Sequence, residues 1–310
     1  MRRVSTFAAA ILVTASSVLA QTPPPPGQPA NPPGQGRQRM SPEERAKAQA
    51  AETERMFAMV RPIDAVDTIW IEEMTWLEVR DAMKAGKTTV IVPTGGVEQN
   101  GPYLATGKHN YVNRATCEVI ARKLGNALCA PNVPFVPEGG FEPKTSHMIY
   151  PGTISLSEQT YQALLTDIAS SLKAHGFEHI ILIGDSGGNQ DGMKTVAQTL
   201  TTRWNGSKTT IHFIPEYYQY PEAYKYAAAN FGWKEVPEGH HDDPTISTIM
   251  MTVDPNSVRI KQRMATNKAS INGIPLAPVD QAVAWGKKLV DYRAQVTVDA
   301  IKKALATATH

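Results

Sequence analysis

Cysteine is nearly absent from this chain of 310 residues, in which Cys117 and Cys129 are the only two. Two cysteines exclude the disulfide-rich scaffolds of small secreted domains. Cys117 falls in an expected buried helix and Cys129 in an expected strand. The sequence leaves open whether the two form a disulfide.

A surplus of charge of either sign is also missing. The sequence has 31 basic and 29 acidic residues, and removal of Arg2 and Arg3 with a signal peptide leaves 29 of each. A chain without a basic patch is not expected to bind nucleic acid.

Long apolar runs are missing as well, because the run over 7–20 is too short for a membrane-spanning helix. This run follows Arg2 and Arg3 and ends in small residues, which is typical of a secretory signal peptide cleaved after Ala20. We therefore expect a periplasmic or secreted protein with no membrane span in the mature chain.

Composition divides the remaining chain into three parts. Residues 21–40 are rich in proline and glycine and are expected to be a disordered linker. Ser41 and Pro42 form a helix-start signal, so we expect an N-terminal helix over 41–62. The remainder, 63–310, is expected to be one α/β domain.

Apolar patterning within this domain alternates between strands and helices. Buried strands are expected over 88–96, 127–137, 179–184 and 209–215, and helices over 113–125, 157–176, 192–204 and 282–305. This alternation predicts a three-layer αβα fold with a mostly parallel sheet. Such sheets bind ligands at the carboxyl ends of their strands.

Polar side chains gather at two of these strand ends. Glu98 and Asn100 follow the first strand, and Asp185 and Ser186 follow the third. Ser186 lies in a G-x-S-x-G context between a strand and a helix, which is compatible with a serine nucleophile. A trypsin-like arrangement is excluded because that architecture is all-β.

Several motifs resemble the creatininase (creatinine amidohydrolase) family, in order along the chain. The segments that carry the resemblance are PTGGVEQNGPYLATGKHN, SHMIYPGTISLS, LIGDSGGNQ, GHHDDPTISTIMM and INGIPLAPVDQAVAWGKKLV. The family patterns that they match include P-x-G-S-x-E-Q-H-G-P, E-H-x-x-F-P-G-T and N-G-H-G-G-N. The resemblance implies the family's fold and a metal-dependent hydrolase that cleaves an amide or related C–N bond in a small molecule. Together with the expected signal peptide, it predicts an exported enzyme of this type.

Known family members typically bind two divalent metals, and this sequence departs from their ligand set. Glu98 matches a family ligand, whereas Asn100 and Ser186 stand where the family has histidine, and His109 stands where it has a bridging aspartate. The resemblance therefore implies an altered site with about one tightly bound ion. The expected ligands are Glu98, His109, Asp185 and Asp243, with zinc as the expected metal and manganese or iron as alternatives.

The remaining site candidates are catalytic or substrate-binding. His241, His240 and Asn100 are expected to be catalytic, with a histidine as general base. His147, Tyr150, Ser186 and Tyr103 are expected to contact a small-molecule substrate. The resemblance also implies a homo-oligomer, a hexamer in many relatives. Two further hypotheses stay open, a catalytically inactive binding protein on the same scaffold and a metal-free serine hydrolase that uses Ser186.

Overall fold

The structure is a computed structural model that describes residues 40–307. The expected signal peptide and most of the expected linker lie outside the described residues. None of the helices within the described range has the length and apolarity that crossing a membrane requires.

The chain divides into two compact units after Val60. The described part of the first unit is helix α1 (Pro42–Ala58), which buries none of its residues. Its start is well defined: the Ser41 side chain accepts from the Glu44 backbone, the Glu44 side chain accepts from the Ser41 backbone, and proline follows the cap. The helix lies within the range 41–62 expected from the sequence and ends at Ala58.

The second unit is built on a four-stranded parallel sheet with the order β2-β1-β3-β4. The strands are β1 (Thr89–Thr94), β2 (Ala127–Cys129), β3 (His179–Gly184) and β4 (Thr210–Phe213). β1 and β3 are paired from Thr89 opposite His179 to Thr94 opposite Gly184. Both are apolar and almost wholly buried, as expected for central strands covered on two faces.

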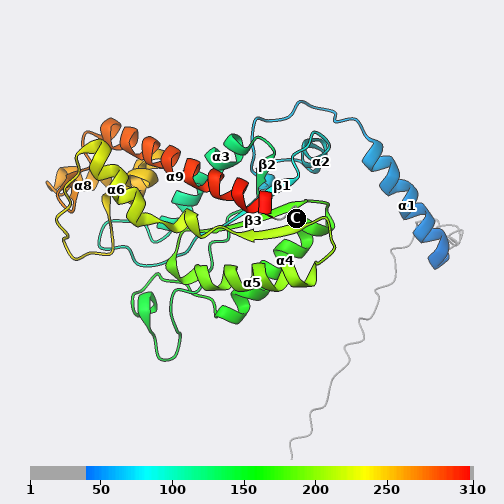
Figure 1. The fold of residues 1–310 in the computed structure, drawn as a ribbon, viewed down its shortest axis with the longest axis horizontal. Coiled ribbons are helices and arrows are strands. Elements are labelled where there is room, and N and C mark those ends of the chain that lie inside the picture. The colour runs from blue at the N-terminus through cyan, green and yellow to red at the C-terminus, as the bar shows by residue number, and fades with distance from the viewer. Residues whose placement is uncertain (1–39, 308–310) are drawn as a thin grey trace, which may run out of the picture. The chain divides into compact units, whose positions relative to one another are not determined.

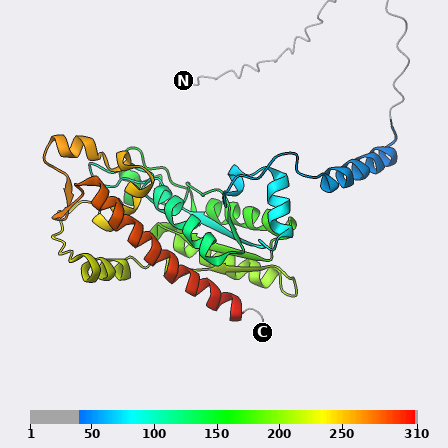
Figure 2. The same cartoon turned by 90° about the horizontal axis from the view of Figure 1, so that it is seen from above.

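Helices cover both faces of this sheet, which confirms the αβα fold. Figure 1 shows α4 (Glu158–Ala174) and α5 (Gln190–Arg203) on one side, with α3 (Lys108–Leu124) and α9 (Val279–Thr307) on the other. Strand residues alternate between the two layers, so Val90 and Val92 face α4 and α5 while Ile91 faces α3 and α9. Figure 2 shows α9 running along α3, which it contacts directly.

The other elements surround this core. They are α2 (Trp76–Lys84), α6 (Tyr220–Phe231), α7 (Pro244–Val253), α8 (Ile260–Ala265), β5 (Ser270–Ile271), β6 (Ile274–Pro275), and the 3-10 helices Ile71–Glu73, Ser146–Ile149, Gly187–Asn189, Pro215–Tyr218 and Pro255–Val258. The two short strands form a separate antiparallel hairpin. An apolar cluster joins α6, α7 and α9, so these helices extend the core beyond the sheet.

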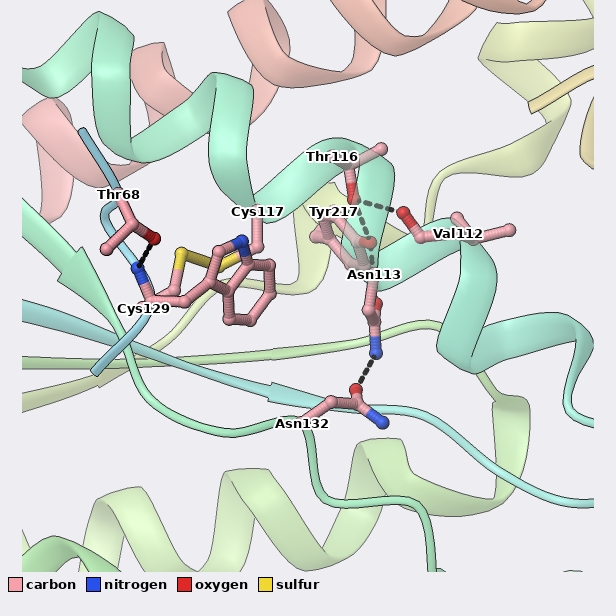
Figure 3. The surroundings of a disulfide bond; sticks show 9 residues. Thr68, Val112, Asn113, Thr116, Cys117, Cys129, Asn132 and Tyr217 are labelled. Carbon is pink, nitrogen blue, oxygen red and sulfur yellow. Dashed lines mark hydrogen bonds between the residues drawn. A yellow bond between two sulfur atoms is a disulfide. The ribbon is translucent and has the colours of Figure 1, made fainter. Parts of the chain in front are cut away.

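The two cysteines form a disulfide that joins α3 to β2. Both side chains are fully buried. Figure 3 shows them near a chain of hydrogen bonds from Thr116 through the Tyr217 hydroxyl to Asn113. The pairing that the sequence left open is therefore present in the structure.

Candidate active site

The site begins with the two glycines that follow β1. A Cβ atom on Gly95 would lie 2.0 Å from Asn110 Oδ1, and one on Gly96 would lie 2.2 Å from Glu138 Oε1. Any other residue would therefore displace these side chains. The closely packed backbone of Gly95 and Gly96 leads to Glu98 at the carboxyl edge of the sheet, where Glu98 is 2 % exposed.

Two side chains in the first turn of α3 place nitrogen atoms next to the Glu98 carboxylate. Gly107 caps this helix, and Lys108 and His109 are its first residues. Lys108 Nζ lies 3.1 Å from Glu98 Oε1, and His109 Nε2 lies 2.8 Å from the same oxygen. Both side chains are buried, so they are held beside the carboxylate with little access to water.

Asp185, directly after β3, holds the other nitrogen of the same imidazole ring. Its Oδ2 atom lies 2.8 Å from His109 Nδ1. Its Oδ1 atom accepts hydrogen bonds from Arg293 Nη2 at 2.8 Å and from the Tyr220 hydroxyl at 2.6 Å. Burial alone would raise the pKa of Asp185, but the Arg293 charge and the bonds from His109 and Tyr220 outweigh it and lower the pKa.

Two further histidines reach Glu98 from separate segments. His147, in the 3-10 helix Ser146–Ile149, places Nε2 3.1 Å from Glu98 Oε2. His241, in the segment before α7, places Nε2 3.0 Å from Glu98 Oε1. One ligand atom from each of Glu98, His147 and His241 lies within 4.8 Å of the others. One carboxylate and two imidazoles so close together are suited to a divalent transition metal.

The electrostatics of this group favour metal binding. Burial opposes ionisation of Glu98, but hydrogen bonds from His109 and His241 and the charges of His109 and Lys108 outweigh it, so the Glu98 pKa is lowered. Burial, followed by the repulsion of neighbouring cationic groups, lowers the pKa of His147 despite the attraction of Glu98. An ionised carboxylate and a neutral imidazole are the forms that bind a metal ion.

Glu138 is a second carboxyl in the site, and sequence reasoning missed it. It is 4 % exposed, its Oε2 accepts from the Ser186 hydroxyl at 3.3 Å, and its Oε1 has no hydrogen-bond partner among the described residues. Burial and then the nearby Glu98 charge raise the Glu138 pKa to about 8. A carboxyl of this kind can exchange a proton near neutral pH. The loop over 136–140 has no recognisable motif, so no local pattern points to Glu138.

A pocket of about 580 Å³ adjoins these carboxyl groups. Its lining includes Glu98, Glu138 and the four basic side chains of Lys108, His109, His147 and His241. Tyr218, Tyr220 and Tyr224 form part of its wall, and Gly187 and Gly188 lie beside Ser186. A Cβ atom on Gly188 would lie 1.9 Å from the Pro137 carbonyl oxygen, so the loop after β3 needs glycine to pack against the loop that carries Glu138. The volume suits a small molecule rather than a folded partner.

The family model described as "Creatininase: Creatinine amidohydrolase" matches residues 72–300. The chain belongs to the creatininase family. Membership of this family confirms the resemblance seen in the motifs.

Curated and solved relatives of this creatininase-family chain are distant. A creatinine amidohydrolase from Pseudomonas putida is 26 % identical over 121 residues, which are 37 % of this chain and 44 % of that protein. The chain spans less than half the length of the curated relatives it matches. A mutant creatininase has the same fold with a TM-score of 0.54 at 19 % identity, covering 77 % of this chain and 99 % of the other. A creatininase described as its Mn form gives a TM-score of 0.50 at 21 % identity, covering 78 % and 99 %.

In this creatininase-family site the structure brings three of the four predicted metal ligands close together, Glu98, His109 and Asp185. These three side chains are hydrogen-bonded to one another. His109 is bonded through both ring nitrogens, to Glu98 and to Asp185. Asp243 caps α7 by accepting from the Ile246 backbone at 2.7 Å, and burial raises its pKa to about 6. The group with metal-binding geometry instead contains His147, predicted to bind substrate, and His241, predicted to be catalytic.

The remaining predicted residues divide between the pocket and other places. His240 and Ser186 line the pocket. Asn100 is 1 % exposed and donates to the Glu98 carbonyl oxygen at 2.9 Å, so it braces the loop. Tyr103 lies under the Arg263 guanidinium at 4.3 Å and lines a different cavity. Tyr150 is 48 % exposed.

Proposed function

We propose that this protein is a metal-dependent hydrolase that cleaves an amide or related C–N bond in a small molecule. The observation that carries the proposal is the convergence of His147 and His241 on the Glu98 carboxylate in a pocket of about 580 Å³. Membership of the creatininase family supports the reaction class.

The residues present fit one divalent ion. Glu98, His147 and His241 supply one carboxylate and two imidazoles, a donor set that suits zinc and leaves room for a water or substrate ligand. They do not reproduce the two-metal set that the family resemblance implies, because Asn100 and Ser186 stand in place of histidines. Zinc is our first choice, with manganese and iron as alternatives. A bound ion of this type acidifies water and polarises a carbonyl group.

The protein's own residues would prepare the site for this chemistry. Asp185 and His109 fix the orientation of Glu98, and the Glu138 carboxyl lines the same pocket. Three tyrosines supply aromatic surface on one wall of the pocket. Specificity for a small substrate would follow from these few placed polar groups in a pocket of this volume.

We further propose that the protein is exported and acts as a homo-oligomer, a hexamer by family resemblance. The Cys117–Cys129 disulfide supports export, because such bonds persist in oxidising compartments and are rare in the cytosol. Fractionation of cells and light scattering of the purified mature protein test the two statements.

The central test is metal content together with two substitutions. Protein purified without chelators should contain a transition metal, and Glu98→Gln should remove nearly all hydrolysis of the best substrate found among small cyclic amides and formamides. Ser186→Ala is the matched control and should keep most activity. Loss of a true nucleophile costs several orders of magnitude in rate. A loss of that size in folded Ser186→Ala would support a serine hydrolase instead.

The Ser186 nucleophile stays an untested prediction, with little in the geometry to favour it. Its hydroxyl donates to Glu138 and accepts from the Gly188 backbone at 3.3 Å. No histidine bonds Ser186 among the described residues. A serine nucleophile normally needs such a base within hydrogen-bond reach.

A further inference from the structure

One oxygen of Glu98 is surrounded by nitrogen groups. Oε1 lies 3.1 Å from Lys108 Nζ, 2.8 Å from His109 Nε2 and 3.0 Å from His241 Nε2. The other oxygen, Oε2, has His147 at 3.1 Å. Oε1 is therefore contacted by both side chains from α3, whereas Oε2 faces His147.

Lys108 is an unusual residue to bury at this place. Its side chain is 3 % exposed, and it sits at the first turn of α3, where the helix dipole already disfavours a cation. A buried ammonium needs a carboxylate partner to offset its loss of hydration. Glu98 is that partner, so the lysine places a positive charge next to the Glu98 carboxylate.

His109 is held just as firmly. Its two ring nitrogens each lie 2.8 Å from a carboxylate oxygen, one of Glu98 and one of Asp185. Asp185 is fixed in turn by Arg293 and Tyr220. Both ring nitrogens are thus engaged by carboxylates, and the position of the ring is set from the far side by the end of β3 and by α9.

We propose that Lys108 and His109 fill the place of a second metal ion beside Glu98, so that the site holds a single divalent ion, and that His109 positions Glu98 rather than binding the ion. This inference rests on the proposed function, because it concerns the same site. It assigns Lys108 a role as a built-in cation, and it separates two ligand histidines, His147 and His241, from one positioning histidine.

X-ray absorption of the zinc-loaded full-length protein tests the proposal without a substrate. The expected result is one zinc per chain with two imidazole ligands. His109→Gln should keep both imidazoles in the spectrum, because His109 positions Glu98 and is not a ligand. His147→Gln and His241→Gln should each lose one imidazole from the spectrum.

Lys108→Met tests the proposal through the affinity for zinc. Removal of a positive charge so close to the ion should tighten zinc binding about tenfold or more, measured by competition with a chromophoric chelator. Lys302→Met, on the exposed side of α9, is the matched control and should leave the affinity unchanged. Lys108→Gln serves as a second variant if the methionine variant does not fold, and circular dichroism verifies each fold.

The outcomes separate this inference from the proposed function. Wild-type protein that binds no transition metal contradicts both. One zinc with three imidazoles, with one lost in His109→Gln, makes His109 a ligand and overturns only the inference. Two zinc ions per chain, or unchanged or weaker binding in folded Lys108→Met, also overturns it and leaves the hydrolase proposal standing.

Discussion

Glu138 carries a carboxyl whose pKa is raised by its surroundings in the folded protein. Its carboxyl is buried beside Glu98, and its pKa rises from 4.5 to about 8. Between these values the folded protein keeps a proton that the unfolded chain has lost. The stability linked to this carboxyl is therefore fully present below pH 4.5 and is lost as the pH rises through about 8.

Glu138→Gln should remove this pH dependence, because the amide does not titrate. The free energy of unfolding of the variant, minus that of the wild type, should rise with pH across this window by up to about 1.4 kcal/mol per pH unit. Urea unfolding at several pH values measures the difference, and contributions from other titrating groups cancel in it. Parallel curves for the two proteins would contradict the raised pKa.

At the scale of elements, the disulfide ties the helix that carries Lys108 and His109 to the edge of the sheet. Cys117 lies in α3 and Cys129 in β2, with a sequence separation of 12 (Figure 3). A cross-link over so short a loop restricts the unfolded chain modestly.

The double variant Cys117→Ala/Cys129→Ala should lose about 2–4 kcal/mol in free energy of unfolding, because its unfolded chain is no longer cross-linked. Urea unfolding of the variant and of oxidised wild type provides the measurement. Wild type unfolded with a reductant should match the variant, and equal stability of all three would show that the bond contributes nothing.

Local signals in the sequence were sufficient for the central elements. β1, β3, α4 and α9 follow from apolar runs, helical spacing and Ser157 as a cap. The expected strand over 127–137 shortens to Ala127–Cys129 because Pro131 and Pro134 cannot donate to a ladder. The expected helices do not include α7, although Asp243 before Pro244 is a helix-start signal.

The site was predictable where it depends on strand ends and hidden where it depends on distant partners. Glu98 and Asp185 follow neighbouring parallel strands, so their proximity could be inferred. Arg293 is separated from Asp185 by 108 positions in the chain, and no local pattern links the two. Glu138 lies on an irregular loop whose course depends on packing against Gly96 and Gly188. Such contacts exist only once the whole domain has folded.

At the scale of the whole molecule, residues 1–38 should be dispensable for the mature protein. The tract over 21–38 has almost no apolar side chains, so ordering it would cost conformational entropy with little burial in return. A protein that begins at residue 39 should keep its melting temperature, metal content, activity and oligomeric state. Loss of any of these would show that the tract packs against the protein or a neighbouring copy.

Arg293 makes the site depend on α9. The sheet and the helices that flank it come from earlier parts of the chain, whereas the guanidinium that neutralises Asp185 arrives with α9. Until that helix docks, Asp185 lacks its strongest partner, the Arg293 guanidinium. A chain clipped ahead of residue 293 would therefore hold the sheet without the group that neutralises Asp185. Completion of the site thus depends on a helix that is synthesised after every strand of the sheet.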